Sequence, residues 1–305
     1  ELSKPLVEDQ EYDQIKSEIF SLEKKYNFLK SENSPSKKVG YKPSKTFKKV
    51  LHKVSMLSLS NAFSEEDLIN FEKKIINFLD KDSSFEIEYS AEPKIDGISA
   101  SLTYQKGKFI MGLSRGDGKE GEDITQNLKT INDIPKEILI KDFPTDIDVR
   151  GEVFIGNKDF EKIKDKFANP RNAASGSLRQ KNPIDTKKIP LKFIAYTFGN
   201  EKGMKVQKQN EYLQKLTEWG FKTNPFNKTL KGVQNLMNNY YEIEKKRNEI
   251  DFDIDGIVYK INDFNLQKRL GNVANSPRWA IAHKFSANKG VSKILNIDIQ
   301  VGRTG

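Results

Sequence analysis

After residue 85 the chain consists of short β-rich runs that are separated by turns and by three helical stretches. The runs read EIEYSA, ISASLTY, FIMGLSR, IDVRGEVFI, LKFIAYTF, IDGIVYKI, WAIAHKF and ILNIDIQV. The second and third runs are joined by a tight turn at Gln105–Lys108, and helical patterns fall near 157–167, 208–218 and 233–249. Strands therefore outnumber helices, and we expect an α+β fold with largely antiparallel sheets and helices packed against them.

The part before residue 85 predicts two helices joined by a basic linker. Residues 9–27 carry apolar side chains at helical spacing, with Asp9 as the candidate N-cap. Residues 28–53 hold eight Lys against one acid and read as a linker. A second helix opens at Ser64, with Asp67 three residues later as in a capping box. Its expected core residues are Leu68, Phe71, Ile75 and Phe78.

The reactive side chains of this sequence are few in kind. Cys is absent, and the only histidines are His52 and His283. These counts exclude disulfides, a thiol nucleophile and a thiolate zinc site within these residues, and they nearly exclude a Ser-His-Asp triad. Catalysis must therefore rest on Lys, Arg, Asp and Glu. The sequence also lacks an apolar run near the roughly 18 residues of a membrane helix and lacks a signal peptide, so we expect no membrane contact and a cytoplasmic location.

The basic residues outnumber the acidic ones, 52 to 43, which gives a net charge of +9. A polyanionic partner fits this charge, although a Lys-rich solvated surface produces the same balance. Of the basic residues 44 are Lys and only 8 are Arg. Because only a guanidinium offers a planar fork for phosphate or carboxylate, we hypothesise that Arg is kept where that fork is used. Arg269 does not fit, whereas seven others lie in or beside Gly-, Asn- or carboxylate-rich stretches: Arg115, Arg150, Arg171, Arg179, Arg247, Arg278 and Arg303.

Five short motifs contain the residues suited to catalysis: EPKIDG, SRGDG, RGEVF, DIDGIVYK and WAIAHKF. Each alone has an ordinary structural explanation, such as a turn, a hairpin or a strand Glu that faces water. Together they supply three strand-borne Lys and three acids near Gly turns, which suits a nucleotide-transfer pocket. The lysines are Lys94, Lys260 and Lys284, and the acids are Asp96, Glu152 and Asp255.

A lysine in such a pocket must lose its proton before it can attack. Lowering its pKa from about 10.4 to about 7 requires about 4.6 kcal/mol, and one cation about 4 Å away contributes about 4 kcal/mol at an effective dielectric constant of about 20. We therefore predict that Lys260, Lys284, Arg115 or a bound metal lowers the pKa of Lys94. The same cations would stabilise a phosphoryl group during displacement. The three acids would hold the waters of Mg²⁺ or bind a ribose.

Taken in order, KIDG, SRGDG, RGEVF, DGIVYK and the late KF resemble the covalent nucleotidyltransferases, which include DNA ligases, RNA ligases and capping enzymes. Further stretches resemble the bacterial NAD⁺-dependent DNA ligases: MLSLSNAF, FANPRNAASGSLRQ, SPRWAIAHKF and QVGRTG. This resemblance implies an antiparallel-sheet nucleotidyltransferase domain, similar to ATP-grasp ligases, with a small N-terminal helical lid remnant. It places the lid remnant and linker at 1–44, the adenylation domain at 45–292, and the start of the connection to an oligonucleotide-binding domain at 293–305. Because QVGRTG follows a strand without a closing signal, we expect a fragment of a longer protein.

The resemblance also implies a role for each motif residue. Lys94 is implied as the nucleophile that takes AMP from NAD⁺ and releases nicotinamide mononucleotide, the first step of nick sealing in replication and repair. Adenine would be held by Glu92, a stacking Tyr196 and the backbone of Ser58 and Leu59. Asp96, Arg115 and Glu152 would serve the ribose, with Asp96 and Glu152 binding Mg²⁺ or Mn²⁺ through water. Lys260 and Lys284 would lie on the α-phosphate, with Asp255 orienting that end. Asp9, Tyr12 and Asp13 would bind nicotinamide mononucleotide, and Arg171, Arg179 and Arg247 would bind DNA phosphates.

Alternatives to these interpretations remain open at this point. Arg171, Arg179 and Arg247 would serve equally well in structural ion pairs, and an aromatic residue such as Tyr196 is more often part of a core. The whole chain would also suit an ATP- or GTP-dependent ligase or capping enzyme, or a basic nucleic-acid-binding module without catalysis. The leading prediction has NAD⁺ and AMP as small-molecule ligands, no zinc, a monomeric state, and nicked double-stranded DNA as the partner of the full-length enzyme.

Overall fold

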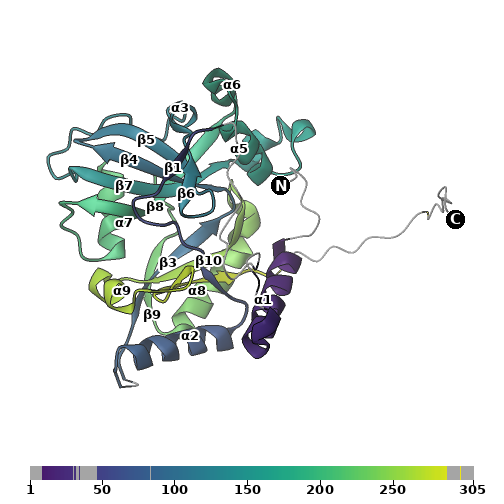
Figure 1. The fold of residues 1–305 in the computed structure, drawn as a ribbon, viewed down its shortest axis with the longest axis vertical. Helices are drawn as coiled ribbons and strands as arrows, with labels where there is room; N and C mark the ends of the chain where they lie inside the picture. Colours follow the sequence, from purple (N-terminus) through teal and green to yellow (C-terminus); the bar gives the residue numbers. More distant parts are fainter. Residues whose placement is uncertain are drawn as a thin grey trace.

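The structure is a computed structural model that describes residues 9–29, 31, 34, 47–82, 84–286 and 296. Two sheets dominate it, and helices cover their outer sides (Figure 1). The five-stranded sheet has the order β2 (Ser60–Ala62), β13 (Ala280–Lys284), β10 (Ile254–Ile261), β3 (Glu88–Ile95) and β9 (Lys228–Lys231). The four-stranded sheet has the order β5 (Lys108–Ser114), β4 (Ile98–Gln105), β7 (Asp146–Ile155) and β8 (Leu191–Lys202). All their pairings are antiparallel except β13 with β2, so the predicted α+β class with antiparallel sheets is confirmed.

Two short ribbons and a set of helices complete the described part of the chain. The ribbons pair β1 (Lys49–Leu51) with β6 (Glu120–Glu122), and β11 (Asn272–Val273) with β12 (Ser276–Pro277). The α-helices are α1 (Asp9–Lys25), α2 (Glu65–Phe78), α3 (Thr125–Leu128), α4 (Asn157–Phe160), α5 (Pro170–Leu178), α6 (Pro183–Lys187), α7 (Gln209–Glu218), α8 (Val233–Lys246) and α9 (Phe264–Leu270). Single 3₁₀ turns lie at Asn27–Leu29, Lys164–Lys166 and Arg247–Glu249.

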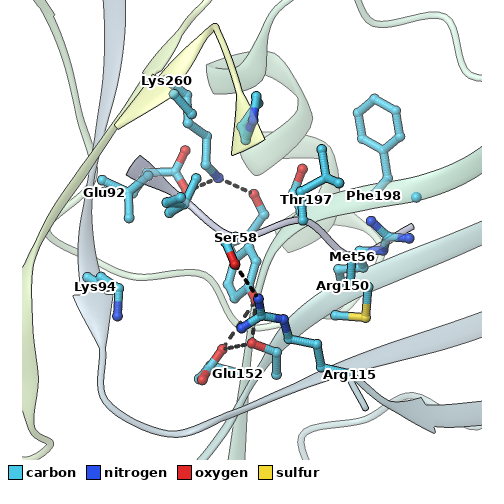
Figure 2. A pocket seen from close by; sticks show the side chains of 18 of the residues that line it. Met56, Ser58, Glu92, Lys94, Arg115, Arg150, Glu152, Thr197, Phe198 and Lys260 are labelled. Carbon is cyan, nitrogen blue, oxygen red and sulfur yellow. Dashed lines mark hydrogen bonds and ion pairs between the residues drawn. The ribbon is translucent and has the colours of Figure 1, made fainter. Parts of the chain in front are cut away.

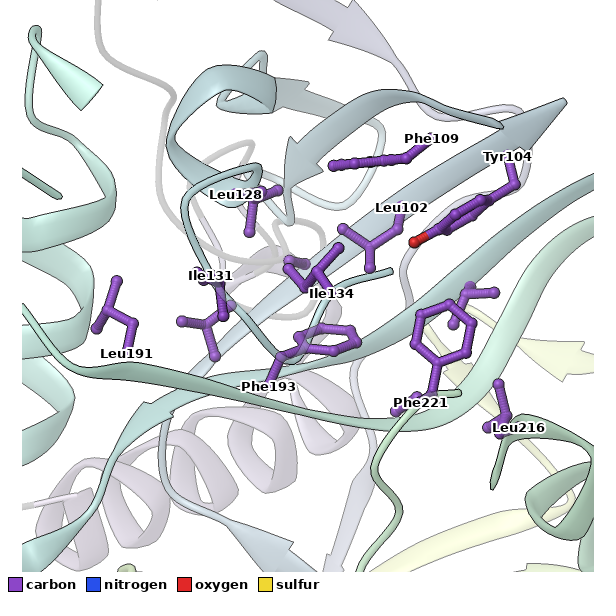
Figure 3. Packing of buried hydrophobic residues seen from close by; sticks show 14 of the residues in the cluster. Leu102, Tyr104, Phe109, Leu128, Ile131, Ile134, Leu191, Phe193, Leu216 and Phe221 are labelled. Carbon is purple, nitrogen blue, oxygen red and sulfur yellow. The ribbon is translucent and has the colours of Figure 1, made fainter. Parts of the chain in front are cut away.

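Each large sheet has its own hydrophobic core. The four-stranded sheet packs against α3, α5 and α7, and Figure 3 shows Leu128, Phe193 and Leu216 converging on Leu102. Aromatic rings fill much of this core, with Tyr104 stacked on Phe109 at a centroid distance of 5.4 Å. The five-stranded sheet packs against α2 and α8 through residues that include Leu68, Ile75, Leu236 and Tyr240. The inner sides of the two sheets are left to face one another across a cavity.

The motif KIDG forms the crossing between the two sheets. Strand β3 ends at Ile95 and β4 begins at Ile98, so only Asp96 and Gly97 connect them. A Cβ added to Gly97 would lie 2.4 Å from the backbone oxygen of Val153, which is closer than real Cβ contacts come. The glycine therefore permits the close approach of β7 that brings the two sheets together at this point.

The helix predictions are confirmed in part. Helix α2 begins at the predicted cap, where Ser64 and Asp67 form a capping box, but Phe78 is 49% exposed and is not a core residue. Helix α1 forms as predicted, yet Ile15 and Leu22 on its apolar face are 44% and 41% exposed. The predicted helix at 157–167 is broken into α4 and a 3₁₀ turn.

One important helix was not predicted. FANPRNAASGSLRQ forms α5, which starts with an Asn169 cap and Pro170 in its first turn, a favourable combination for a helix start. Ala173, Ala174 and Ser177 bury their small side chains there. Of the earlier predictions, the strand at 294–301 and the boundaries at 44/45 and 292/293 lie outside the described residues. No helix found within the described ranges has the length and apolarity needed to cross a membrane.

Candidate active site

A cavity of about 1220 Å³ lies between the inner sides of the two sheets (Figure 2). This central cavity receives side chains from both sheets and from the segment before β2. Most of the predicted site residues line it: Ser58, Leu59, Glu92, Lys94, Asp96, Arg115, Glu152, Arg171, Arg179, Tyr196, Asp255, Lys260 and Lys284. Its volume exceeds the roughly 300–1,000 Å³ that is usual for a small-molecule site. The structure therefore brings together residues that are spread over more than two hundred positions of sequence.

Lys94 and Lys284 share one carboxylate at one end of the cavity. The Nζ of Lys94 donates to Oδ2 of Asp255 at 2.9 Å, and the Nζ of Lys284 lies 3.6 Å from the same oxygen. The two lysines lie on β3 and β13, on either side of Gly256 in β10. A Cβ on Gly256 would lie 2.2 Å from the backbone oxygen of His283, so the glycine lets the three strands approach at this point.

Asp255 reaches Lys94 because β10 is irregular. Along β10, Val258 and Lys260 line the cavity, while Ile257 and Tyr259 enter the core of the five-stranded sheet. In a regular strand Asp255 would share the face of the two core residues, since side chains alternate. The register of β10 against β3 shifts between residues 254 and 256, and such a bulge re-aims a side chain. Among the described residues, Oδ1 of Asp255 is a buried atom that has no hydrogen-bond donor.

The charge environment of Lys94 differs from the prediction. Burial lowers the pKa of Lys94, but the carboxylate of Asp255, followed by those of Glu152 and Asp96, more than offsets burial and raises the pKa above its usual value. The prediction that Lys260, Lys284 or Arg115 lowers this pKa is therefore wrong for this structure, and the alternative of a bound metal stays a prediction. The physical reason is that the charged group in direct contact with Lys94 is a carboxylate, and that the two other lysines are themselves paired with carboxylates.

Lys260 and Glu92 form a second, more deeply buried pair further along the same strands. Their Nζ and Oε2 atoms are 2.7 Å apart, and their side chains are 8% and 5% exposed. Lys260 also donates to the backbone oxygen of Tyr196 at 3.0 Å, and its Nζ lies 5.2 Å from the centre of the Tyr196 ring. Figure 2 shows Lys260 beside Glu92, with Lys94 further along β3. Lys260 and Lys284 thus lie on different carboxylates, whereas the sequence predicted them together on one phosphate.

Glu92 has further donors that sequence analysis did not single out. Ser90 and Gln209 both donate to its Oε1 at 2.9 Å. Gln209 also donates to the backbone oxygen of Tyr196 at 2.7 Å. Neither residue belongs to a recognised motif, and α7 brings Gln209 to Glu92, from which it is more than a hundred residues away in the chain. No local sequence signal predicts this contact.

Glu152 lines the same cavity and interacts electrostatically with Lys94. Its Oε2 accepts hydrogen bonds from the hydroxyls of Ser99 at 2.9 Å and Tyr196 at 3.2 Å. Burial is the main cause that raises the pKa of Glu152, to about 7, and Lys94 opposes this rise. Burial also raises the pKa of the Tyr196 hydroxyl above its usual value. Glu152 is therefore a carboxyl group that changes charge near neutral pH.

Arginines hold the segment that precedes β2. Arg115 donates to the Oγ of Ser58 at 3.0 Å, and Arg150 donates to the backbone oxygens of residues 54 and 55. The backbone N–H of Ser58 donates to the backbone oxygen of Asn275 at 2.8 Å, so it is already used within the chain. Burial is the main cause that lowers the pKa of both guanidinium groups from their usual value. The two arginines thus fix this segment as one wall of the cavity.

The three arginines predicted to bind DNA have protein partners in this structure. Arg171 lies 2.9 Å from Oδ1 of Asp96, and Arg179 lies 3.1 Å from the fully buried carboxylate of Glu122. The guanidinium of Arg247 lies 5.5 Å from the ring centre of Phe285. These contacts are the structural alternative that the sequence left open, and they leave the prediction of DNA binding untested.

The hypothesis about retained arginines needs a correction. The guanidinium groups of Arg150, Arg269 and Arg278 bind main-chain oxygens of the protein. Arg269 did not fit the hypothesis, yet it binds a backbone oxygen just as Arg150 and Arg278 do, which did fit it. Arg303 lies outside the described residues. The planar guanidinium group is therefore used at several positions, but largely to bind backbone oxygens of the chain itself.

Two further ligand sites were predicted, one for nicotinamide mononucleotide and one for a metal ion. Asp9, Tyr12 and Asp13 lie in the first turns of α1, and their side chains fall outside the part of the chain that the structure describes. Within the described ranges there is no group of three or more His, Cys, Asp or Glu arranged to hold a metal directly. Asp96 and Glu152 nevertheless both line the cavity, which fits Mg²⁺ because this ion keeps several waters and often binds through only one or two carboxylates.

Comparison with known proteins identifies close relatives. A family profile described as "NAD-dependent DNA ligase adenylation domain" matches residues 44–288, and one described as "DNA ligase-like, N-terminal NAD+-binding domain" matches residues 1–40. A DNA ligase of Pelagibacter ubique is 69% identical over 99% of this chain and 45% of that protein. A DNA ligase of Parvibaculum lavamentivorans is 46% identical over 99% of this chain and 44% of that protein. The chain therefore spans less than half the length of these relatives.

Proposed function

Since the chain belongs to the NAD-dependent DNA ligase adenylation domain family, we propose that it forms a covalent lysyl-AMP from NAD⁺. In this reaction the lone pair on Nζ of Lys94 forms a bond to the α-phosphorus of NAD⁺. The bond from that phosphorus to the bridging oxygen breaks, and nicotinamide mononucleotide leaves with the oxygen and the electron pair. The observation that carries the proposal is the position of Lys94 in the central cavity, 2.9 Å from Asp255 and beside Lys284 on the same carboxylate.

The raised pKa of Lys94 means that its amine must lose a proton before it attacks. Asp255 is in hydrogen-bond contact with the Nζ and can accept that proton, which meets the geometric requirement for a general base. Lys284 lies on the same carboxylate, next to the reacting atoms. It is therefore available to stabilise the negative charge on the α-phosphate during displacement.

The other end of the cavity suits the nucleobase. Glu92 presents a carboxylate and Lys260 an ammonium group, both held by hydrogen bonds and both largely buried. An exocyclic amine of the base can donate to Glu92, and a ring nitrogen can accept from Lys260. The ring of Tyr196 supplies an aromatic face next to them. We therefore assign Lys260 to the base end of the cavity and Lys284 to the phosphate end.

The part of the cavity near Lys94 suits the ribose and a divalent cation. Glu152 and Asp96 both line the cavity and interact electrostatically with Lys94, and Arg115 interacts with Glu152. Asp96 and Glu152 would hold Mg²⁺ or Mn²⁺ through its waters, and the ion would supply charge neutralisation at the phosphates when bound. Asp9, Tyr12 and Asp13 of α1 remain the proposed contacts for the nicotinamide mononucleotide part.

The proposal extends to a full-length protein of the size of the relatives. There the lysyl-AMP would be passed to the 5′-phosphate of nicked double-stranded DNA, in replication and repair, within the bacterial cytoplasm and by a monomer. Arg171, Arg179 and Arg247 are the proposed phosphate contacts. Each would have to exchange the protein partner that it has in this structure for DNA.

The test is covalent labelling with NAD⁺ that carries ³²P in its adenylate phosphate. We expect an acid-labile label on the chain in the presence of Mg²⁺, and we expect Lys94→Ala to abolish it because no other amine takes its position. Lys188→Ala is the matched control, since Lys188 also pairs with an aspartate but at the surface. Labelling from ATP or GTP instead of NAD⁺ would favour the other nucleotidyltransferases. Absence of label from all three, and absence of AMP transfer from preformed lysyl-AMP to nicotinamide mononucleotide, would favour a binding module.

A further inference from the structure

Gln209 closes a ring of buried hydrogen bonds at the base end of the cavity. Its side-chain amide donates to Oε1 of Glu92 at 2.9 Å and to the backbone oxygen of Tyr196 at 2.7 Å. Lys260 makes the equivalent pair of contacts, to Oε2 of Glu92 at 2.7 Å and to the same backbone oxygen at 3.0 Å. One carboxylate and one carbonyl are thus bridged twice, by an amide on one side and an ammonium group on the other.

This ring joins elements that have separate cores. Glu92 and Lys260 lie in the five-stranded sheet, and Tyr196 lies in the four-stranded sheet. Gln209 is the first residue of α7, is only 1% exposed, and has its backbone N–H held by the backbone oxygen of Asn262 at 2.7 Å. Both hydrogens of its amide nitrogen have an acceptor, so the amide has one orientation that satisfies its surroundings.

The chemistry of the ring determines what Glu92 can offer to a ligand. Gln209, Ser90 and Lys260 all donate to the Glu92 carboxylate, so its oxygens are held as oriented acceptors. A base that approaches Glu92 must therefore bring a hydrogen-bond donor. The 6-amino group of adenine is such a donor, whereas the 6-keto oxygen of hypoxanthine or guanine would face another acceptor and lose its hydrogen bond.

We propose that Gln209 is a positioning residue that makes the cavity selective for a 6-aminopurine over a 6-oxopurine by holding Glu92 as an oriented acceptor. Gln209 acts through Glu92 and the backbone of Tyr196 and does not itself touch the ligand. This inference rests on the proposed function, since it requires the nucleobase to lie at the Glu92 end of the cavity.

The test compares the binding of AMP and of inosine 5′-monophosphate by isothermal titration calorimetry. Gln209→Glu replaces the donating amide with a second carboxylate against Glu92 and the Tyr196 carbonyl, so it removes the hydrogen bonds that orient Glu92 as an acceptor. We expect the AMP-to-inosine-monophosphate affinity ratio to fall by about tenfold, the value of one hydrogen bond to a charged group.

Two further variants separate this role from a general effect on folding. Gln209→Met has a similar size and removes both hydrogen bonds, and we expect it to weaken AMP binding and to lower the ratio. Gln214→Glu is the matched control, because Gln214 lies on the same helix and also bonds to a glutamate, Glu218, but is exposed. It should leave both affinities unchanged. Thermal unfolding of each variant reports whether the fold is intact.

The possible outcomes distinguish this inference from the proposed function. If the wild-type chain prefers AMP but both Gln209 variants keep the wild-type ratio, the inference is overturned and the proposed function stands. A uniform loss of affinity for both nucleotides in the variants would also overturn it, since that is what a merely structural role predicts. If the wild-type chain does not prefer AMP, the assignment of the base end fails together with the inference.

Discussion

Two lysine–carboxylate pairs lie on the same two strands and differ in how firmly they are held. On β3 and β10, Glu92 pairs with Lys260 and Lys94 pairs with Asp255, at similar distances of 2.7 and 2.9 Å. The first pair is 8% and 5% exposed in its Lys and Glu side chains, while the second is 29% and 19% exposed in its Lys and Asp side chains. Three hydrogen bonds link the first pair to fixed partners, whereas in the second pair one oxygen of Asp255 contacts both Lys94 and Lys284.

This difference matches the work that each end is proposed to do. A pair that recognises a base should keep its geometry, and burial with saturated hydrogen bonds achieves that. A nucleophile must release its partner and its proton, which a partly exposed pair with a shared acceptor allows. The comparison teaches that two lysine–carboxylate pairs on the same two strands can differ in rigidity. Their surroundings hold one pair fixed and leave the other able to separate.

The largest expected effect is on stability and separates the two lysines. Lys260→Met leaves the buried charge of Glu92 without its cation, and we expect the free energy of unfolding to fall by about 3–5 kcal/mol. In Lys94→Met, Asp255 still has Lys284 at 3.6 Å, so we expect a loss of less than about 1 kcal/mol, although lysyl-AMP formation is abolished. Urea unfolding of both variants measures the difference. Equal destabilisation would mean that the two ends are not distinct.

A smaller effect concerns the charge state of Lys94. Because the Asp255 carboxylate raises the pKa of Lys94 against the effect of burial, we expect Asp255→Asn to lower that pKa. The measurement is the pH dependence with which an amine-selective reagent modifies Lys94, read by mass spectrometry of the peptide. Asp185→Asn, at the exposed partner of Lys188, should leave the Lys94 profile unchanged. A midpoint that stays in place would refute the assigned cause.

The smallest effect is expected at Glu152, which interacts electrostatically with Lys94 of the second pair. Its pKa is raised by burial from the ordinary 4.5 to about 7 in the folded chain, so the folded chain binds its proton more tightly than the unfolded chain. The stability this supplies is complete below about pH 4.5 and is lost as the pH rises through about 7. Between pH 5 and 8 we therefore expect the melting temperature to fall less in Glu152→Gln than in the wild type. The expected difference between the two falls is about 2–4 °C. If the melting temperatures of the two proteins changed equally with pH across this range, the raised pKa would be contradicted.

Much of the site could be predicted from motifs, because each motif is a local run in which spacing along a strand sets the face. Glu92 and Lys94 are two positions apart on β3 and both line the cavity, as strand alternation requires. The three acids and three lysines that the motifs were predicted to supply also line it. The charge balance around Lys94 could not be predicted in this way. Formal charges along a sequence do not show which carboxylate reaches which ammonium group.

What the sequence determined by itself is the class of fold and the set of reactive residues, because strand length, alternation and turn glycines are local properties. What only the tertiary structure decided is how those residues are paired. The register shift in β10 turns Asp255 toward Lys94, against the alternation that its position alone would predict. The packing of α7 places the side chain of Gln209 in hydrogen-bond contact with Glu92. Both depend on how distant segments pack, and packing between segments far apart in the chain leaves no periodic trace in either segment.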